Sequence, residues 1–354
     1  MKRVVVIEGE DASPEAVRPS VELLQSFALP IEWLFPPVGL PARESHGSFF
    51  PDEARAAIDA SDATLFGSTS GPSGPALTYL RWGKQTFANV RPARWMPGCN
   101  SPLKRPEEVD FVIVRENLED MYVRLEGELS ELAPLELFSP TARRGVNELG
   151  PGRYAIKVIT EERTIAVTRF SFELARKRRA AGYPGKVTCG TKHNMLPRSD
   201  GYFLEVARGV AKDYPDVPFE SYIIDDFARR LIAEPGSLDV VLLPNLYGDV
   251  LSDAAAGLIG GLGLAPSGCF GDGYAYFESA HGTAPDIVGQ HIINPTATLL
   301  SGAMMFEYLG YGEAANQVRT AIARVYAQGE HLTPDQGGGA STGEFCEAVL
   351  AATA

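Results

Sequence analysis

The sequence predicts an α/β protein in which helices cover a parallel or mixed sheet. Near the N-terminus, short apolar runs at Val4–Ile7, Ile31–Leu34 and Ala63–Gly67 are typical of buried strands. Helical patterns at about 14–27 and 53–60 lie between them. This β-α-β-α-β order favours parallel strands joined by helical crossovers.

The same alternation continues along the chain, without an internal repeat. Residues 124–155 lack a clear period, and we expect an arm or an extended hairpin there. The other expected elements are strands at Phe111–Val114, Lys186–Gly190, Ser221–Ile224 and 239–243, and helices at Thr164–Ala181, Asp200–Tyr214, Phe227–Ala233, Asn294–Tyr308 and Glu313–Gln328, the last two being the last long helices.

Composition limits the possible partners. The 354 residues carry a net charge of −13, which argues against binding to nucleic acid or to anionic membranes. No apolar run approaches the roughly 18 residues that a membrane span requires. The four cysteines are too far apart for a metal-type pair, and they indicate free thiols in a reducing compartment. We therefore expect a cytoplasmic protein.

The most informative segment is the run 245–257, which follows an apolar strand and contains Asp249 and Asp253. If a helix begins here, the two carboxylates lie one turn apart on one face and repel each other unless a cation neutralises them. Hard oxygen ligands without His or Cys nearby suit Mg²⁺ or Mn²⁺. The alternative is a solvated helix face, but such a face should carry more Lys and Glu than the small and apolar neighbours here.

Several motifs occur in a fixed order over nearly the whole chain. They are Phe-Ala-Asn-Val-Arg-Pro at 87–92, Val-Arg-Glu-Asn at 114–117 through Tyr122, Thr-Lys-His-Asn at 191–194, the 245–257 run, Leu-Ile-Gly-Gly-Leu-Gly at 258–263, Glu-Ser-Ala-His-Gly-Thr-Ala-Pro-Asp at 278–286 and Thr-Pro-Asp at 333–335. From about Val4 to Val349 the chain resembles the β-decarboxylating dehydrogenases, which act on isocitrate, homoisocitrate, 3-isopropylmalate, tartrate and D-malate. The segments 256–268 and 308–310 favour the bacterial homoisocitrate and NAD-isocitrate type.

The resemblance implies a fold and an assembly. It implies a two-lobed, non-Rossmann fold of the isopropylmalate dehydrogenase type. A large cofactor-binding domain would comprise 1–96 and 258–354, and a small dimerisation domain 97–257 with the arm at about 124–155. The implied assembly is a homodimer with shared active sites, or a tetramer.

The resemblance also implies a metal site. The family oxidises a 2-hydroxy acid by hydride transfer to a nicotinamide and then loses the carboxylate at C3, so an electrophile must hold charge on the C2 oxygen. Asp249 and Asp253 would bind Mg²⁺ or Mn²⁺, with Asp225 donated by the partner subunit. Asp226 competes for that third place, although the alignment favours Asp225. Asp225 could instead cap a helix that starts at Phe227.

Further site residues follow from matches to the family motifs. Arg81, Arg91 and Arg115 correspond to the substrate arginines, whose planar guanidinium groups suit carboxylates. Tyr122 matches the tyrosine that protonates the enol. Lys192, donated by the other subunit, matches the lysine that helps to deprotonate the C2 hydroxyl.

The cofactor implied is NAD. An acid at Asp286 would bind the ribose hydroxyls and repel a 2′-phosphate, and Ile287 is also typical of enzymes that use NAD. The cofactor-binding residues that the family motifs imply are Asn194, Glu278, His281, Gly282, Thr283, Ala284, Asp286, Ile287 and Asn294.

Two segments depart from the family pattern. The first loop normally reads Gly-Asp-Gly-Ile-Gly-Pro-Glu, and here Asp11 and Ser13 replace two of its glycines, so its backbone is expected to differ. The specificity loop has Pro75, Leu77 and Thr78, with neither the Ser and Asn of isocitrate enzymes nor the Arg of homoisocitrate enzymes. Because an unpaired buried carboxylate is costly, we expect a small-molecule hydroxy acid with a small or partly apolar C3 substituent. The alternative is that other residues, which the motifs do not identify, recognise a third carboxylate.

A competing hypothesis is a non-catalytic regulatory subunit of a hetero-oligomeric isocitrate dehydrogenase. Such subunits lose metal and acid–base residues. Here the tyrosine, the lysine, the three aspartates and the three arginines all remain, which favours an enzyme. A plain binding or scaffold protein has no supporting feature in the sequence.

Overall fold

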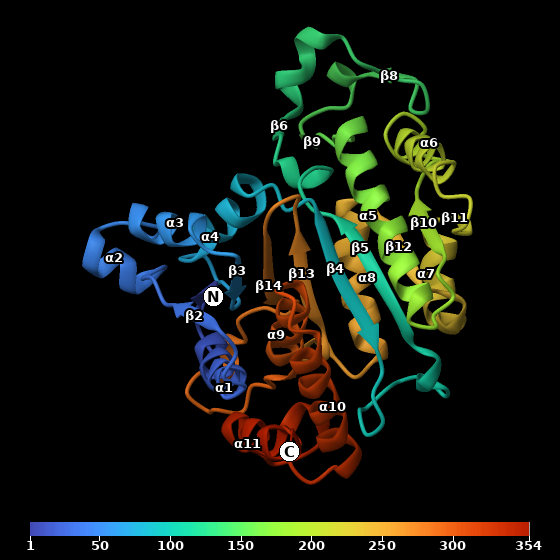
Figure 1. The fold of residues 1–354 in the computed structure, drawn as a ribbon. Coiled ribbons are helices and arrows are strands. Elements are labelled where there is room, and N and C mark those ends of the chain that lie inside the picture. The colour runs from blue at the N-terminus through green and yellow to red at the C-terminus, as the bar shows by residue number, and fades with distance from the viewer. Residues whose placement is uncertain (354) are drawn as a thin grey trace.

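A mixed sheet of ten strands forms the centre of the computed structural model, which describes residues 1–353 (Figure 1). Strands β4, β13 and β14 run antiparallel in the middle, and the outer pairs are parallel. The predicted α/β class with a mixed sheet is therefore confirmed. In spatial order the strands are β11 (Phe219–Ile223), β10 (Val187–Thr191), β12 (Val240–Leu243), β5 (Asp110–Glu116), β4 (Ala88–Arg94), β13 (Pro266–Phe270), β14 (Ala275–Ser279), β3 (Ala63–Phe66), β1 (Lys2–Ile7) and β2 (Ile31–Leu34).

Helices cover both faces of this sheet because its strands are apolar on both sides. In β12, Val240 and Leu242 pack into the cluster that contains α5 and α6, whereas Val241 and Leu243 pack into the cluster that contains α7 and α8. Such alternation follows from the pleat of a strand. The helices are α1 (Ser13–Gln25), α2 (Leu40–His46), α3 (Asp52–Asp59), α4 (Gly74–Thr78), α5 (Glu161–Ala180), α6 (Asp200–Ala211), α7 (Ile224–Ala233), α8 (Asn245–Leu258), α9 (Thr296–Tyr308), α10 (Gly312–Gln328) and α11 (Thr342–Ala352).

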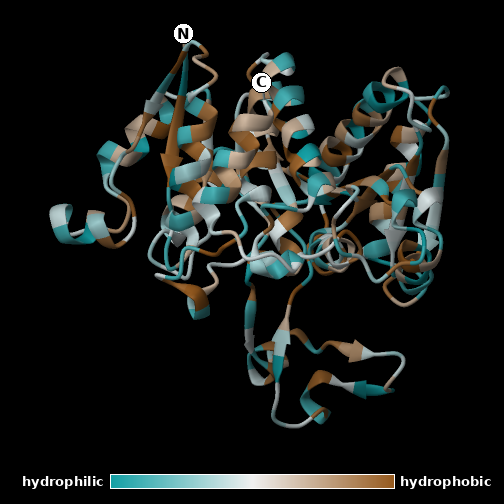
Figure 2. Ribbon diagram, turned by 90° about the horizontal axis from the view of Figure 1, so that it is seen from below, coloured by the Kyte–Doolittle hydropathy of each residue, from teal (hydrophilic) through white to brown (hydrophobic). Residues whose placement is uncertain are grey.

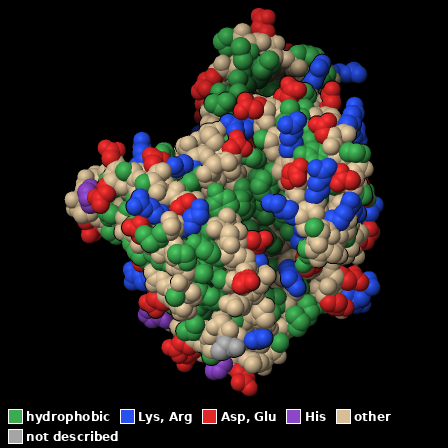
Figure 3. Space-filling model, in the orientation of Figure 1, with side chains coloured by type: hydrophobic (Ala, Val, Ile, Leu, Met, Phe, Trp, Pro, Cys, Tyr) green, Lys and Arg blue, Asp and Glu red, His purple; other side chains and the backbone are tan. Residues whose placement is uncertain are grey.

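Residues 124–155 project from the body of the molecule (Figure 2). This arm contains two small antiparallel sheets, β6 (Glu126–Glu128) with β9 (Arg153–Ala155) and β7 (Phe138–Ser139) with β8 (Arg144–Gly145). Apolar side chains are exposed on it, which Figure 3 shows as green patches at its end. The division into two domains stays a prediction, because one sheet runs through both proposed units.

The structure differs from the expected elements in three places: the strands beside the site, the C-terminus and the start of α7. The sequence does not predict strands β4, β13 and β14. It also does not predict α11, which follows the last expected helix, Glu313–Gln328. Helix α7 begins at Ile224 rather than Phe227, so the alternative role of Asp225 as a helix cap is wrong. Among residues 1–353, none of the helices combines the length and the apolar character needed to cross a membrane.

Candidate active site

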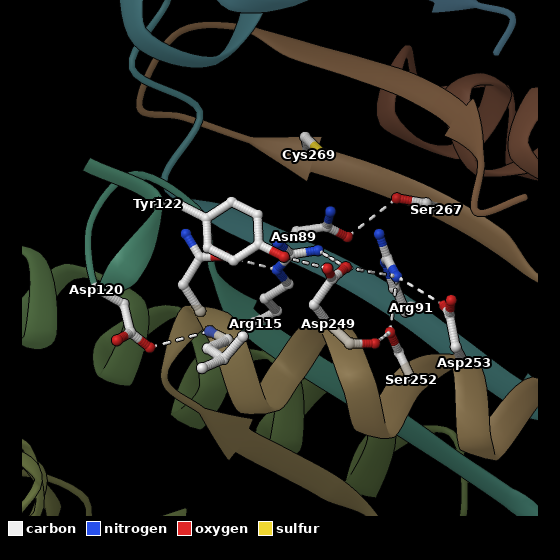
Figure 4. Close-up of polar contacts among 12 residues, drawn as sticks. Asn89, Arg91, Arg115, Asp120, Tyr122, Asp249, Ser252, Asp253, Ser267 and Cys269 are labelled. Atoms are coloured by element: carbon white, nitrogen blue, oxygen red, sulfur yellow. Dashed lines mark hydrogen bonds and ion pairs between the residues drawn. The ribbon is translucent and has the colours of Figure 1, made fainter. Parts of the chain in front are cut away.

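Strands β4 and β5 and helix α8 bring two arginines and two aspartates together (Figure 4). Asp249 and Asp253 lie one turn apart on α8, as expected. Arg91 Nη1 lies 3.5 Å from Asp249 Oδ1 and 3.3 Å from Asp253 Oδ1, and it donates to Ser252 Oγ at 2.7 Å. Arg115 Nη1 donates to the same oxygen of Asp249. Opposite charges thus alternate across the cluster, which removes most of the repulsion between the aspartates.

Helix α8 can lie this close to Arg115 because of two residues in its first turn. A β-carbon on Gly248 would come within 2.6 Å of the Arg115 side chain, so only glycine fits at this contact. Asn245 Oδ1 accepts a hydrogen bond from Arg115 Nε at 2.8 Å. The guanidinium of Arg115 is consequently fixed in orientation, with only 1% of its side chain exposed.

Two buried donors in this cluster have no hydrogen-bond partner, Arg91 Nε and Arg115 Nη2. Burial, together with the nearby charges of Arg91 and Arg81, lowers the pKa of Arg115 to about 10. Three converging cations with unused donors are costly to bury unless an anion joins them. The arrangement is therefore complementary to a carboxylate ligand.

Tyr122 lies over the arginine and donates to the aspartate. Its hydroxyl contacts Asp249 Oδ2, and the Arg115 guanidinium carbon lies 4.8 Å from the centre of its ring. Burial, and then the bond to Asp249, raise the pKa of Tyr122. The phenol is thus held protonated at the edge of the cluster, where it can donate a proton.

The pKa values of the two aspartates are shifted in opposite directions. Burial pushes the pKa of Asp249 upward, but Arg115 and Tyr122 outweigh it and the pKa is lowered. Burial raises the pKa of Asp253, and Arg91 offsets this only in part. Asp253 therefore has less compensation for its negative charge than Asp249 has.

Arg81 enters the cluster from the turn Tyr79–Gly83, a single π-helical turn that follows α4. Its Nε donates to the hydroxyl of Tyr276 at 3.2 Å. Glu278 lies two residues further along β14, and burial raises its pKa against the opposing effect of Arg81. All three expected arginines are therefore brought together, with Glu278 beside them.

The specificity residues Leu77 and Thr78 lie on α4, just before Arg81. Leu77 packs against the apolar cluster formed by β1, β3 and β14, which leaves it partly buried. Thr78 is exposed. Neither residue supplies a cation to the site.

Lys192 and Asp225 lie just after the ends of β10 and β11, and within residues 1–353 Asp225 does not group with Asp249 and Asp253. Lys192 Nζ is 2.5 Å from Asp225 Oδ1, and this bond lowers the pKa of Asp225. Asp226 instead pairs with Arg229 and Arg230 along its own helix. Of the two neighbouring acids, Asp225 is thus the one on the side of Lys192.

The predicted cofactor segment is tied to the altered first loop. Thr283 Oγ1 donates to Asp11 Oδ2 at 2.5 Å, and the amide of Ala12 donates to Thr283 O at 3.0 Å. Asp11 has a φ of 55°, in the left-handed region that favours glycine. The side chain of Asp11 thus forms a hydrogen bond that a glycine at this position could not form.

Ser13, the second replacement in this loop, also forms hydrogen bonds through its side chain. Its hydroxyl donates to Glu8 O at 2.8 Å and accepts from the amide of Ser68, also at 2.8 Å. Ser68 Oγ in turn donates to His281 O at 2.8 Å, and burial lowers the pKa of His281. The loop therefore holds the 281–287 segment through side chains.

The remaining cofactor candidates fall into three groups. Gly282, Asp286 and Asn194 are exposed, and Ala284 and Ile287 pack against Ala12, Ala16 and Ile293. Asn294 is buried, with its amide donating to Asp335 at 3.0 Å and to Tyr326 at 3.1 Å. Its carbonyl accepts from the amide of Thr296 at 3.0 Å. The polar atoms of Asn294 are thus already committed within the described chain.

A divalent metal fits the chemistry of the aspartate pair. Both donors are carboxylates, and they are 35% and 51% exposed, so they are open to an ion from solvent. Within residues 1–353, however, no group of three acidic, His or Cys side chains lies close enough to hold a metal. Within the described residues the pair therefore supplies two carboxylate ligands, and the other ligands would come from the substrate, from water or from a partner subunit.

Several polar residues that support the site were not predicted from the sequence. Asn245 and Ser252 bind the arginines, and Asn89 accepts from Ser267 Oγ at 3.0 Å behind them. Asn245 and Ser252 lie inside the conspicuous 245–257 run, so that run contained the signal. Asn89 and Tyr276 lie on strands that were not expected.

Comparisons with known proteins agree with this architecture. Residues 3–349 match the family described as isocitrate/isopropylmalate dehydrogenase. A 3-isopropylmalate/3-methylmalate dehydrogenase of Methanocaldococcus jannaschii is 40% identical over 350 residues, covering 99% of this chain and 98% of that one. An isocitrate/homoisocitrate dehydrogenase of Thermus thermophilus is 40% identical over 357 residues, with the same coverage of both chains.

Solved structures show the same fold. The crystal structure of isocitrate dehydrogenase from Methylococcus capsulatus superposes with a TM-score of 0.86 at 32% identity, covering 100% of this chain and 99% of that one. Relatives at 35% identity are named as catalytic or regulatory subunits of isocitrate dehydrogenase [NAD]. The resemblance found in the sequence is confirmed, and the chain belongs to the isocitrate/isopropylmalate dehydrogenase family.

Proposed function

We propose that this protein is an NAD-dependent, metal-requiring dehydrogenase that oxidatively decarboxylates (2R)-malate or a 3-substituted malate to a 2-oxo acid and CO₂. One observation carries the proposal: three arginines converge on an aspartate pair, and two buried arginine donors are unused. A malate unit brings two carboxylates and a hydroxyl. The carboxylates would satisfy the arginines, and the hydroxyl would face the aspartates.

Mg²⁺ or Mn²⁺ would be held by Asp249 and Asp253 together with Asp225 of the partner subunit. When bound, the metal polarises the C2 oxygen and stabilises the negative charge that decarboxylation leaves there. Hard carboxylate donors support this choice of ion. The arginines keep the substrate carboxylates oriented while C2 changes from tetrahedral to planar.

Tyr122 and Lys192 are proposed to move the protons. Lys192 of the partner subunit would help to remove the proton of the C2 hydroxyl. The Tyr122 hydroxyl would then donate a proton to C3 of the enol. The raised pKa of Tyr122 supports this role, because the phenol is fully protonated near neutral pH.

NAD is proposed as the cofactor, bound along the 281–287 segment. The exposed carboxylate of Asp286 would accept hydrogen bonds from the ribose hydroxyls and repel a 2′-phosphate. The loop around Asp11 and Ser13 would hold that segment in place through the hydrogen bonds of these two side chains. Glu278 and Asn194 of the motifs would border the nicotinamide.

The substrate is proposed to have a small or partly apolar group on C3. Leu77 is packed into an apolar cluster and Thr78 has no charge, so α4 offers no partner for a third carboxylate. Burial of an unpaired carboxylate costs several kcal/mol. A regulatory role is not favoured, because the arginines, Tyr122 and both aspartates are retained and converge.

The purified protein would be assayed for NADH and CO₂ with Mn²⁺ and a panel of D-malate, tartrate, 3-methylmalate, 3-isopropylmalate, isocitrate and homoisocitrate. NADH and CO₂ should form in equal amounts with NAD⁺, fastest on malates with a small C3 group, and more slowly with NADP⁺. A chelator should abolish both products. A protein that forms no NADH with any of these acids would refute the proposal.

A further inference from the structure

A second buried ion cluster lies outside the substrate cluster. It connects the segments that carry Tyr122 and Lys192, the two proposed proton-transfer residues. Lys157 Nζ is 2.5 Å from Asp200 Oδ1 and 3.3 Å from Asp120 Oδ1, and both carboxylates are fully buried. The Lys157 ammonium also lies 4.5 Å from the centre of the Tyr247 ring. A buried ammonium between two carboxylates and an aromatic face is fixed in place by strong contacts on every side.

On one side, Asp120 fixes the elements that carry the chain's own catalytic groups. Its Oδ2 accepts a hydrogen bond at 2.9 Å from the amide of Leu246, in the first turn of α8, where a carboxylate is favourable. Its backbone pairs with Val158 at 2.9 and 3.3 Å. Tyr122 follows two residues later, and α8 carries Asp249.

On the other side, Asp200 fixes the backbone of the lysine motif. Its Oδ2 accepts a hydrogen bond at 2.6 Å from the amide of Lys192. The side chain of Lys192 points to Asp225, 2.5 Å away. Asp200 is the first residue of α6, so its position is set by that helix as well.

Lys157 provides the positive charge for both aspartates. Within residues 1–353, no other Lys or Arg forms an ion pair with Asp120 or Asp200. Without the ammonium, two buried carboxylates would repel each other, and the turns that they hold would separate. The link between Tyr122 and Lys192 therefore depends on this one side chain.

We infer that Lys157 is a positioning residue of the active site: by joining Asp120 to Asp200, it fixes Tyr122 of its own subunit and the Lys192 that this subunit gives to its partner. The inference rests on the proposed function. It predicts that one substitution impairs both sites of a dimer, although Lys157 touches neither substrate nor cofactor.

The first test compares Lys157→Gln with Lys157→Arg and with Lys186→Gln. Lys186, the control, pairs with Glu220 at 2.7 Å and precedes β10, at the opposite end of that strand from Lys192. Lys157→Gln should lower kcat by about 10- to 100-fold. KM should stay within about threefold, because the substrate arginines lie on other elements. Lys157→Arg should recover most of kcat, and Lys186→Gln should match the wild type. An unchanged kcat in folded Lys157→Gln would overturn the inference.

The second test uses mixed dimers with the wild type, purified through two different tags. A Lys157→Gln/wild-type dimer should retain clearly less than half of the wild-type kcat, because each of its sites contains one displaced group. Asp200→Ala leaves Lys157 paired with Asp120, so it keeps a balanced charge and folds even where Lys157→Gln does not. Its homodimer should lose kcat about tenfold or more at constant KM, and its mixed dimer should retain about half of the wild-type kcat, since only Lys192 is displaced.

Either of two results would overturn the inference: half or more of the wild-type activity in the Lys157→Gln/wild-type mixed dimer, or full activity in the Asp200→Ala homodimer. Failure of the proposed function is distinguishable from this. In that case the wild type itself forms no NADH with any acid of the panel, whereas failure of the inference leaves the wild type active and the Lys157 variants equal to it.

Discussion

The Arg115 side chain shows how burial and charge together create a requirement for an anion. Its guanidinium is enclosed by Gly248 and Asn245 and is fixed on Asp249. Yet Nη2 has no partner, and the charges of Arg91 and Arg81 help to lower its pKa to about 10. A carboxylate of the substrate would accept the hydrogen bond of Nη2 and add a negative charge beside the arginines, and both contacts would favour its binding.

Substitution of Arg91 tests this requirement. Arg91→Lys keeps the charge but removes the planar pair of donors, so kcat/KM should fall by roughly 10- to 100-fold, the equivalent of one charge-assisted hydrogen bond. Arg94→Lys is the matched control, since Arg94 lies on the same strand, is 65% exposed and pairs only with Asp110. Steady-state kinetics with the preferred acid would measure both. Equal effects of the two substitutions would contradict the assignment of Arg91.

Thr78 tests the argument about the C3 substituent. Because α4 has no cation, Thr78→Arg should raise kcat/KM for isocitrate or homoisocitrate by about tenfold, through a new charge-assisted contact with the third carboxylate. Activity on small malates should fall or stay constant. Thr78→Gln, which is similar in length but uncharged, is the control. A wild type that already prefers homoisocitrate would show that the pocket argument is wrong.

At the scale of elements, α8 carries two carboxylates with opposite energetic consequences. Asp249 has a lowered pKa in the folded protein, so its ionised form stabilises the fold above its unfolded pKa, and this stability is lost as the pH falls through the folded pKa. Asp253 has a raised pKa, so its ionised form destabilises the fold at neutral pH. Binding of a cation beside Asp253 would therefore stabilise the fold.

The paired substitutions test that sign. In the metal-free protein at pH 7, Asp249→Asn should lower the free energy of unfolding and Asp253→Asn should raise it. Each change should be about 1 kcal/mol or less, because both side chains are partly exposed. The difference should shrink as the pH falls through about 3.9, the usual pKa of an unfolded Asp, and should vanish below the lower pKa that Asp249 has in the folded protein. Denaturant titrations in chelator would measure it, and the same sign for both variants would refute this account of α8.

Apolar strands and periodic helices could be predicted closely from the sequence, because runs such as Val4–Ile7 in β1 and Val240–Leu243 in β12 are continuously apolar between turn signals. The central strand β4 could not, since Asn89 and Arg91 interrupt it and Pro92 cannot donate to a sheet. In the structure, Pro92 pairs only with β5, beyond the end of the pairing with β13, so the missing donor costs nothing there. The polar residues of the site thus interrupt the apolar pattern by which this strand would be predicted.

The C-terminal helix α11 was missed although its signal was present. Ser341 Oγ accepts a hydrogen bond from the amide of Glu344, and the Glu344 side chain accepts one from the amide of Ser341. This is a capping box, which the spacing Ser-x-x-Glu predicts.

Only part of the site could be predicted from the sequence. The motifs named its arginines and aspartates, but the contacts of Lys157 with Asp120 and Asp200 join segments far apart in the sequence, and no local pattern reveals such contacts.

At the scale of the whole molecule, the proposed catalytic set is incomplete in one chain. Lys192 and Asp225 pair with each other just after the ends of β10 and β11. Within the described residues, the aspartate pair has no third metal ligand. A two-fold dimer in which each subunit completes the other's site would resolve both facts, and we propose that assembly.

Mixing two inactive variants tests the sharing of sites. Lys192→Met and Asp249→Asn should each abolish activity alone. Because a mixed dimer has one fully wild-type site, random exchange of the two should restore about a quarter of the wild-type activity. Activity assays before and after subunit exchange would measure it, with a mixture of Tyr122→Phe and Asp249→Asn as the control that cannot complement. No recovery would place Lys192 and Asp249 in the same subunit's site or outside any site.

The most direct measurement is a crystal structure of the dimer soaked in Mn²⁺, with the ion located by its anomalous scattering. The account predicts one ion per subunit between Asp249, Asp253 and Asp225 of the partner subunit. Density elsewhere, or none between those carboxylates, would contradict the proposed site and the chemistry that depends on it.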